Sequence, residues 1–147
     1  MTEKIKELLI KYREIIVYLI VGVLTTIFSW GIAFIGKMFL DVEGSSLQNF
    51  INNMISWVAG VLFAYPLNRK WVFRSSNPEV LKEFFGFSSS RVSTLIMDIV
   101  IMWLTVNVWG MNYWIAKIFI SSVVVTIANY VFSKLLIFKK KDGNPQE

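Results

Sequence analysis

Two charged residues lie inside an apolar stretch of this sequence, where their side chains could bind an ion. Arg91 and Asp98 both fall in FGFSSSRVSTLIMDIVIMW, residues 85–103, which otherwise has the composition of a membrane-spanning helix. They are seven residues apart, so in a helix they share one face and differ in depth by about 10 Å. A charged side chain at mid-membrane costs about 2.5 to 3.5 kcal/mol. The two residues are therefore expected to have a role, structural or functional.

The chemistry open to the two charges differs. A guanidinium can hold a phosphate through two parallel hydrogen bonds. Arg91 lies seven residues into its span, about 10 Å below the near surface, and snorkelling to the lipid headgroups is the alternative for so long a side chain. Asp98 is too short to snorkel, so it needs a cationic partner, a proton or water.

The last apolar segment carries a second cation and an amide. Lys117 comes four residues after Tyr113, so it is placed in the outer third of the bilayer, where it could bind an anion or snorkel. Asn129 is predicted at about the depth of Arg91, where an amide beside a guanidinium can complete an anion site. It belongs to a polar stripe that hydrogen bonds between helices would also explain. The stripe consists of Ser122, Thr126, Asn129 and Ser133.

Small residues recur every four positions in the second apolar segment and at helical spacing in the first. These stripes are typical of helix faces that pack closely. Asn68 differs from the rest because it follows Pro66, which weakens the helix, and precedes two basic residues. We therefore expect Asn68 in a polar gate at the end of its span. The stripes are Ser56, Gly60, Ala64 and Asn68 in the second segment, and Gly22, Thr26, Ser29 and Ala33 in the first.

The composition shows what must position these residues. Of the 147 residues, 55% are apolar and 17% charged, and the mean hydropathy is +0.56, which indicates a membrane protein. Residues 15–36 form an uncharged run of 22 residues, and about 20 are enough to cross the hydrocarbon core. The run is longer than the apolar part of a signal peptide, lacks a cleavage pattern and is followed by three more apolar segments.

Several function classes are excluded by what the sequence lacks. It has no Cys and no His, so disulfides, thiolate nucleophiles, zinc sites and imidazole acid–base chemistry are absent. Nothing assembles a nucleophile with a base, so we expect no enzyme and no cofactor or metal. The net charge of +5 sits in short basic clusters beside apolar segments, which favours lipid headgroups over nucleic acid as the partner.

The sequence predicts an all-α integral membrane protein with four transmembrane helices and both termini in the cytoplasm. Lys and Arg are concentrated before the first span, between the second and third, and after the fourth, which sets the orientation by the positive-inside rule. A basic, amphipathic N-terminus is expected over residues 1–14, the transmembrane domain over 15–138 and a basic cytoplasmic tail over 139–147. The predicted spans are Ile15 to Met38, Phe50 to Asn68, Phe84 to Val108 and Tyr113 to Ile137.

The two halves of the chain share a pattern. A shift of 65 residues places NRKWVFR (68–74) over SKLLIFK (133–139), as expected for two parallel hairpin repeats of the kind that transporters use. The alternative is that any helix ending at a cytoplasmic interface finishes with aromatic and basic residues.

The segments NRKWVFR, SSSRVSTLIMD, WIAKIFISS and ANYVFSKLLIF, in this order, resemble the GtrA-like family of small four-helix membrane proteins. Within that family the chain is most similar to the teichoic acid glycosylation proteins of Gram-positive bacteria. The resemblance covers about residues 15–140. It implies a flippase that carries undecaprenyl-phosphate-linked sugar across the bacterial cytoplasmic membrane to glycosyltransferases outside. Its pattern falls on Asn68, Val72, Phe73, Arg91, Asp98, Lys117 and Asn129.

From the residues and the resemblance together, we expect Arg91 and Asn129 to bind the lipid phosphate and Lys117 to receive it farther out. Asn68 and Asp98 complete this substrate site, and Ala64, Val72 and Phe73 form a gate and packing surface. Many relatives place an acid in the first span, but residues 15–36 contain none. A proton-coupled step would therefore depend on Asp98 alone.

Two other functions stay open. A small multidrug exporter also has four short helices, but that class needs a Glu in its first helix. A membrane anchor that docks a glycosyltransferase without transporting anything would tolerate loss of the buried charges. A chain this short has little interior of its own, so we expect a homo-oligomer.

Overall fold

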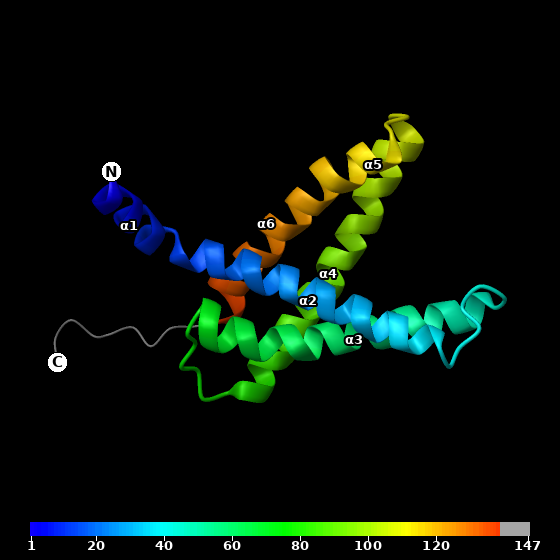
Figure 1. Ribbon diagram of the computed structural model, residues 1–147, viewed down its shortest axis with the longest axis horizontal. Coiled ribbons are helices and arrows are strands. Elements are labelled where there is room, and N and C mark those ends of the chain that lie inside the picture. Colours follow the sequence, from blue (N-terminus) through cyan, green and yellow to red (C-terminus); the bar gives the residue numbers. More distant parts are fainter. Residues whose placement is uncertain (139–147) are drawn as a thin grey trace. The chain divides into compact units, whose positions relative to one another are not determined.

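The computed structural model describes residues 1–138, and the predicted basic tail, residues 139–147, lies outside the described residues. The described part of the chain is helical and contains four helices long and apolar enough to cross a membrane (Figure 1). The predicted fold class is therefore confirmed. The candidate spans are Arg13–Lys37, Ser46–Val72, Val80–Val108 and Tyr113–Ile137.

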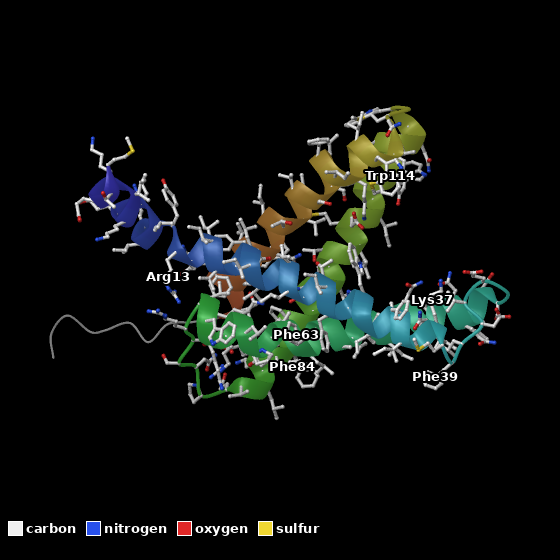
Figure 2. All side chains as sticks on the ribbon, in the orientation of Figure 1. Arg13, Lys37, Phe39, Phe63, Phe84 and Trp114 are labelled. Atoms are coloured by element: carbon white, nitrogen blue, oxygen red, sulfur yellow. The ribbon has the colours of Figure 1, made fainter. Side chains whose placement is uncertain are left out.

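The second and third spans begin about one helical turn earlier than the sequence pattern predicts, because their first turns are polar. Ser45 caps the second span by accepting a hydrogen bond from the Gln48 amide, which satisfies one of the free N–H groups at a helix start. Asn112 does the same for the fourth span, accepting from the Trp114 amide at 3.0 Å. Trp114, labelled in Figure 2, is the second residue of the fourth span.

The chain divides into two compact units, Met1–Arg74 and the part that begins at Ser75. The first unit contains α1 (Thr2–Lys11), α2 (Arg13–Lys37), α3 (Ser46–Leu67) and η1 (Asn68–Val72), where η marks a π-helical turn. The second contains α4 (Val80–Met102), η2 (Trp103–Val108), α5 (Tyr113–Ile115), η3 (Ala116–Ser121), α6 (Ser122–Phe132) and η4 (Ser133–Ile137). Each unit is thus a hairpin of two spans.

In the first unit, α2 and α3 lie side by side (Figure 1) and meet through small residues. A Cβ atom added to Gly60 would overlap the Ser29 hydroxyl, and one added to Gly36 would overlap the Asn52 amide. The Asn52 amide also donates to the Ala33 carbonyl at 3.1 Å. This bears out close packing at Gly60 and Ser29.

The predicted packing stripe on α2 is wrong at its first two members. A Cβ atom at Gly22 would meet no described atom within 4 Å, and Thr26 is exposed. Thr25, one residue earlier, comes within 3.7 Å of the Gly60 position instead. Gly22 and Thr26 are small enough for close packing, but the buried residues of α2 are Tyr18 and Val21. The buried face of the helix is therefore rotated away from the predicted stripe.

The described part of each unit ends in the same local structure. In η1 the Phe73 amide donates to the Asn68 carbonyl, and in η4 the Phe138 amide donates to the Ser133 carbonyl, both at 2.9 Å. Each bond reaches back five residues, so one extra residue is accommodated in the last turn. The two turns are 65 residues apart, in agreement with the repeat read from the sequence.

Polar side chains are buried in these spans while large apolar ones are exposed, the reverse of a protein that folds in water. Nine buried polar or charged residues lie within the spans: Asn52, Ser56, Asn68, Glu83, Thr94, Thr105, Ser121, Asn129 and Ser133. Exposed apolar residues include Leu19, Trp30, Phe34, Ile96, Phe119 and Ile127. This distribution suits helices whose outer faces contact lipid.

Candidate functional site

One face of α4 carries the residues with chemistry. Phe87, Arg91, Thr94 and Asp98 follow one another at spacings of four, three and four, which places them on one side of an α-helix. Phe87 and Thr94 are buried, and Arg91 and Asp98 are partly buried. The facing helices of the same unit, η3 and α6, supply their partners.

Asp98 forms an ion pair with Lys117. The Lys117 ammonium donates to both carboxylate oxygens, at 2.6 Å to Oδ2 and 2.9 Å to Oδ1. The Ser121 hydroxyl also donates to Asp98 Oδ1. The side chains of Lys117 and Asp98 are 36% and 22% exposed. A carboxylate within the span therefore has both a counter-charge and a hydroxyl donor.

A second polar contact lies one turn away on α4. The Thr94 hydroxyl donates to Asn129 Oδ1 at 2.8 Å, and both side chains are buried. This bond fixes the orientation of the amide, because the oxygen is the acceptor. The two N–H donors of the Asn129 side chain have no partner among residues 1–138.

The Arg91 guanidinium lies over the ring of Phe87, with Cζ 4.7 Å from the ring centroid. Phe87 is fully buried and packs against Phe138, with 5.7 Å between ring centroids. A cation over an aromatic face is stabilised and held in place. Within the described residues, no carboxylate and no hydrogen-bond acceptor contacts the guanidinium.

Arg91 and Lys117 therefore differ in their availability. Asp98 is the counter-charge of Lys117, whereas no residue in the described range 1–138 pairs with the Arg91 guanidinium or accepts from its five N–H donors. Asn129 adds free amide donors on the facing helix. An arrangement of free donors and an unpaired positive charge suits an anion rather than a cation.

The remaining residues chosen from the sequence lie in the first unit. Asn68 is buried, and its amide donates to the Ala64 carbonyl at 2.8 Å, while its Oδ1 has no partner among the described residues. Ala64, Val72 and Phe73 are buried, and the Phe73 ring packs on Tyr18 with 6.2 Å between centroids. These residues lie at the end of the first hairpin that is opposite the loop between α2 and α3.

Sequence reasoning missed three residues of the second unit. Phe87 and Thr94 are four residues before and three after Arg91, so a search for neighbours on one helical face would have found them. Ser121 was missed because the predicted polar stripe contains its neighbour Ser122. In the structure Ser122 is exposed, and its hydroxyl donates to the Lys117 carbonyl at 2.7 Å. The π-helical turn η3 shifts the helical register there, and the pattern of an unbroken α-helix does not hold.

Comparison with known proteins shows what this chain is similar to. Residues 17–138 match the family described as GtrA/DPMS, transmembrane domain. The cell wall teichoic acid glycosylation protein GtcA of Listeria innocua is 41% identical over 130 residues, with 86% of each chain covered. GtcA of Listeria monocytogenes is 39% identical over 132 residues, covering 88% of this chain and 87% of the relative.

A third relative is the membrane protein YwcD of Bacillus subtilis, which is 35% identical over 126 residues and is covered to 94% of its length. No solved structure matches the chain.

Proposed function

Because the chain belongs to the GtrA/DPMS transmembrane-domain family, we propose that it moves a polyprenyl-phosphate-linked monosaccharide across the membrane. The sugar would supply glycosylation of a cell-wall polymer such as teichoic acid, the process named for its Listeria relatives. The membrane would be the bacterial cytoplasmic membrane, with both termini in the cytoplasm and undecaprenyl phosphate as the lipid carrier. Glycosyltransferases would be its functional partners.

The observation that carries this proposal is the unpaired guanidinium of Arg91 over the Phe87 ring. A lipid-linked sugar phosphate is an anion, and moving it through hydrocarbon unaided would cost many kcal/mol of desolvation. The Arg91 fork can replace water on two phosphate oxygens. The free N–H donors of Asn129, whose oxygen is occupied by Thr94, can serve a further oxygen.

Lys117 enters the mechanism by exchange of its counter-ion. Its ammonium is bound by both oxygens of Asp98, so a phosphate can first accept from the third N–H of Lys117 and becomes its main counter-ion by displacing that carboxylate. The Ser121 hydroxyl stays with Asp98 as a hydrogen-bond donor when the ammonium turns to the substrate. Lys117 and Asp98 therefore form the second position on the path, and Arg91 with Asn129 the first.

The first hairpin contributes the gate. The Asn68 amide is occupied by the Ala64 carbonyl, but its Oδ1 is a free acceptor, which suits a sugar hydroxyl and not a phosphate oxygen, since the latter has no hydrogen to donate. Ala64, Val72 and Phe73 pack the turn that holds Asn68. A chain of 147 residues would complete its path as a homo-oligomer.

The test is complementation of glycosylation in a host whose own family member is deleted. Arg91→Ala should abolish extracellular glycosylation of the wall polymer while the protein still reaches the membrane. Arg91→Lys keeps the charge but loses the two-pronged geometry, so it should restore glycosylation only in part. The matched control is Lys82→Ala, which removes an exposed cation from the same unit and should leave glycosylation intact.

Two outcomes would redirect the proposal. If Arg91→Ala supports full glycosylation, the anion site is not used, and the chain would be an anchor for a glycosyltransferase instead. If the native chain raises resistance to cationic drugs and has no effect on glycosylation, it would be an exporter.

A further inference from the structure

The N-terminal helix α1 has no partner in its own unit that would explain its apolar residues. It spans Thr2–Lys11, and none of its residues is buried. It joins α2 through one residue, Tyr12, whose backbone angles of φ −102° and ψ 12° bend the chain between the two helices (Figure 1). This short helix is attached to the start of a membrane span and has exposed apolar side chains. Lipid or another protein molecule is needed to cover these side chains.

Three of the four apolar residues of α1 form one face together with Tyr12, the residue that follows the helix. Ile5, Leu8, Leu9 and Tyr12 follow the spacing 0, 3, 4 and 7, which at about 100° per residue gathers them on one side of the helix. Ile5, Leu8 and Leu9 are each about half exposed. Ile10 lies about 150° from the centre of this face and is 76% exposed.

The charged residues of α1 are sorted by sign around this face. The three lysines flank it at about 90° to 110° from its centre, and the two glutamates lie at about 150° to 170°. Lysines at the edges of an apolar face can extend their ammonium groups to lipid phosphates while their methylene chains stay in the apolar layer. The lysines are Lys4, Lys6 and Lys11, and the glutamates are Glu3 and Glu7.

The junction with α2 places this helix at the level of the headgroups. Arg13, labelled in Figure 2, is the first residue of the span, and its guanidinium donates to the Trp71 carbonyl at 2.9 Å. Trp71 lies at the end of the other span of the same unit and is half exposed, as is typical of an interfacial aromatic residue. Since α1 ends two residues before Arg13, its C-terminal end lies at the interface, and its other end is about 15 Å away.

We propose that α1 lies along the membrane surface, with the face formed by Ile5, Leu8, Leu9 and Tyr12 in the headgroup layer and its flanking lysines on anionic lipid headgroups. This role is independent of the proposed transport function. It would hold the start of α2 at a fixed depth and enrich anionic lipid around the first unit.

The experiment uses the full chain in vesicles and takes advantage of the absence of cysteine from the sequence. Leu9→Cys and Ile10→Cys are matched neighbours: both positions are apolar in the native chain, and they lie about 50° and about 150° from the centre of the apolar face. Each variant is labelled with a fluorescent bimane and reconstituted into phosphatidylethanolamine and phosphatidylglycerol vesicles. Quenching is then measured with brominated lipid chains and with aqueous iodide.

The proposal predicts that brominated lipid quenches the probe at position 9 several-fold more strongly than the probe at position 10, and that iodide shows the reverse order. Iodide quenching both probes equally would mean that α1 projects into water. Protection of both probes from both quenchers would mean that α1 packs on protein. Either result overturns the proposal.

A second comparison tests the charge. In vesicles of phosphatidylcholine alone, which carry no net charge, the probe at position 9 should be quenched less by brominated lipid than in vesicles with phosphatidylglycerol. Equal quenching in the two lipids would overturn the assignment of the lysines to anionic headgroups.

Discussion

The ion pair between Lys117 and Asp98 offers a prediction whose size can be worked out from its geometry. The ammonium contacts both carboxylate oxygens at 2.6 and 2.9 Å, inside an apolar span. Lys117→Met and Asp98→Asn each remove one charge and leave the other without a counter-charge. The double variant removes both charges together.

Breaking a buried ion pair by removing one partner costs about 3 to 5 kcal/mol. Because the two side chains retain exposures of 36% and 22%, we reduce this to about 2 kcal/mol for each single change. The double variant leaves no unpaired charge, so it should lose no more than about 1 kcal/mol rather than the sum of about 4. The expected coupling free energy between the two residues is therefore at least about 3 kcal/mol.

Equilibrium unfolding in mixed lipid and detergent micelles measures the free energy of unfolding of the four proteins in this cycle. The exposed pair Lys37 and Glu43, 3.4 Å apart and 51% and 88% exposed, is the control and should give a coupling below about 1 kcal/mol. Single changes at Lys117 and Asp98 that add up to the double change within about 0.5 kcal/mol would refute the reasoning, because they would show that the two charges do not interact.

Three further changes test the packing and the hydrogen bonds. Gly60→Val should lower the free energy of unfolding by about 1 to 3 kcal/mol because the valine side chain would overlap α2. Gly22→Ala places a methyl group in open space and should be neutral or stabilising. Equal effects of the two changes in a thermal unfolding assay would contradict this. Thr94→Val should lower glycosylation by releasing the Asn129 amide from its fixed orientation, and Thr94→Ser should restore it; no difference between the two in the complementation assay would exclude the positioning role. Ser133→Ala should not destabilise the protein, because its hydroxyl is buried without a partner among the described residues; a loss of more than about 1 kcal/mol in the unfolding assay would reveal a missed hydrogen bond.

Apolar length and charge placement were sufficient to predict four membrane helices, because the bilayer requires that every span be long, apolar and internally hydrogen-bonded. The repeat was also visible, since the residues that close η1 and η4 are of the same types, ending in Phe73 and Phe138. The starts of the second and third spans were not predicted correctly. In the second span, Ser45 and the polar residues of the first turn carry no apolar signal.

The pairing of side chains across helices could not be predicted. The sequence placed Asp98 and Lys117 in different spans and left snorkelling open for Lys117, since helical spacing says nothing about the rotation of one helix against another. The π-helical turn η3 then moved the inward position to Ser121, where an α-helical pattern had suggested Ser122. Such turns have no sequence signature comparable to a cap or a proline.

The proposed transport depends on the Arg91 guanidinium, which binds the phosphate of the lipid-linked sugar at the first position on its path across the membrane. The most direct measurement reconstitutes the purified chain into liposomes that hold a polyprenyl-phosphate sugar in one leaflet and follows its arrival in the other. The native chain should raise the rate of transfer above that of empty liposomes, and Arg91→Ala should return it to the empty level. Equal transfer by the native and Arg91→Ala proteins would contradict the claim.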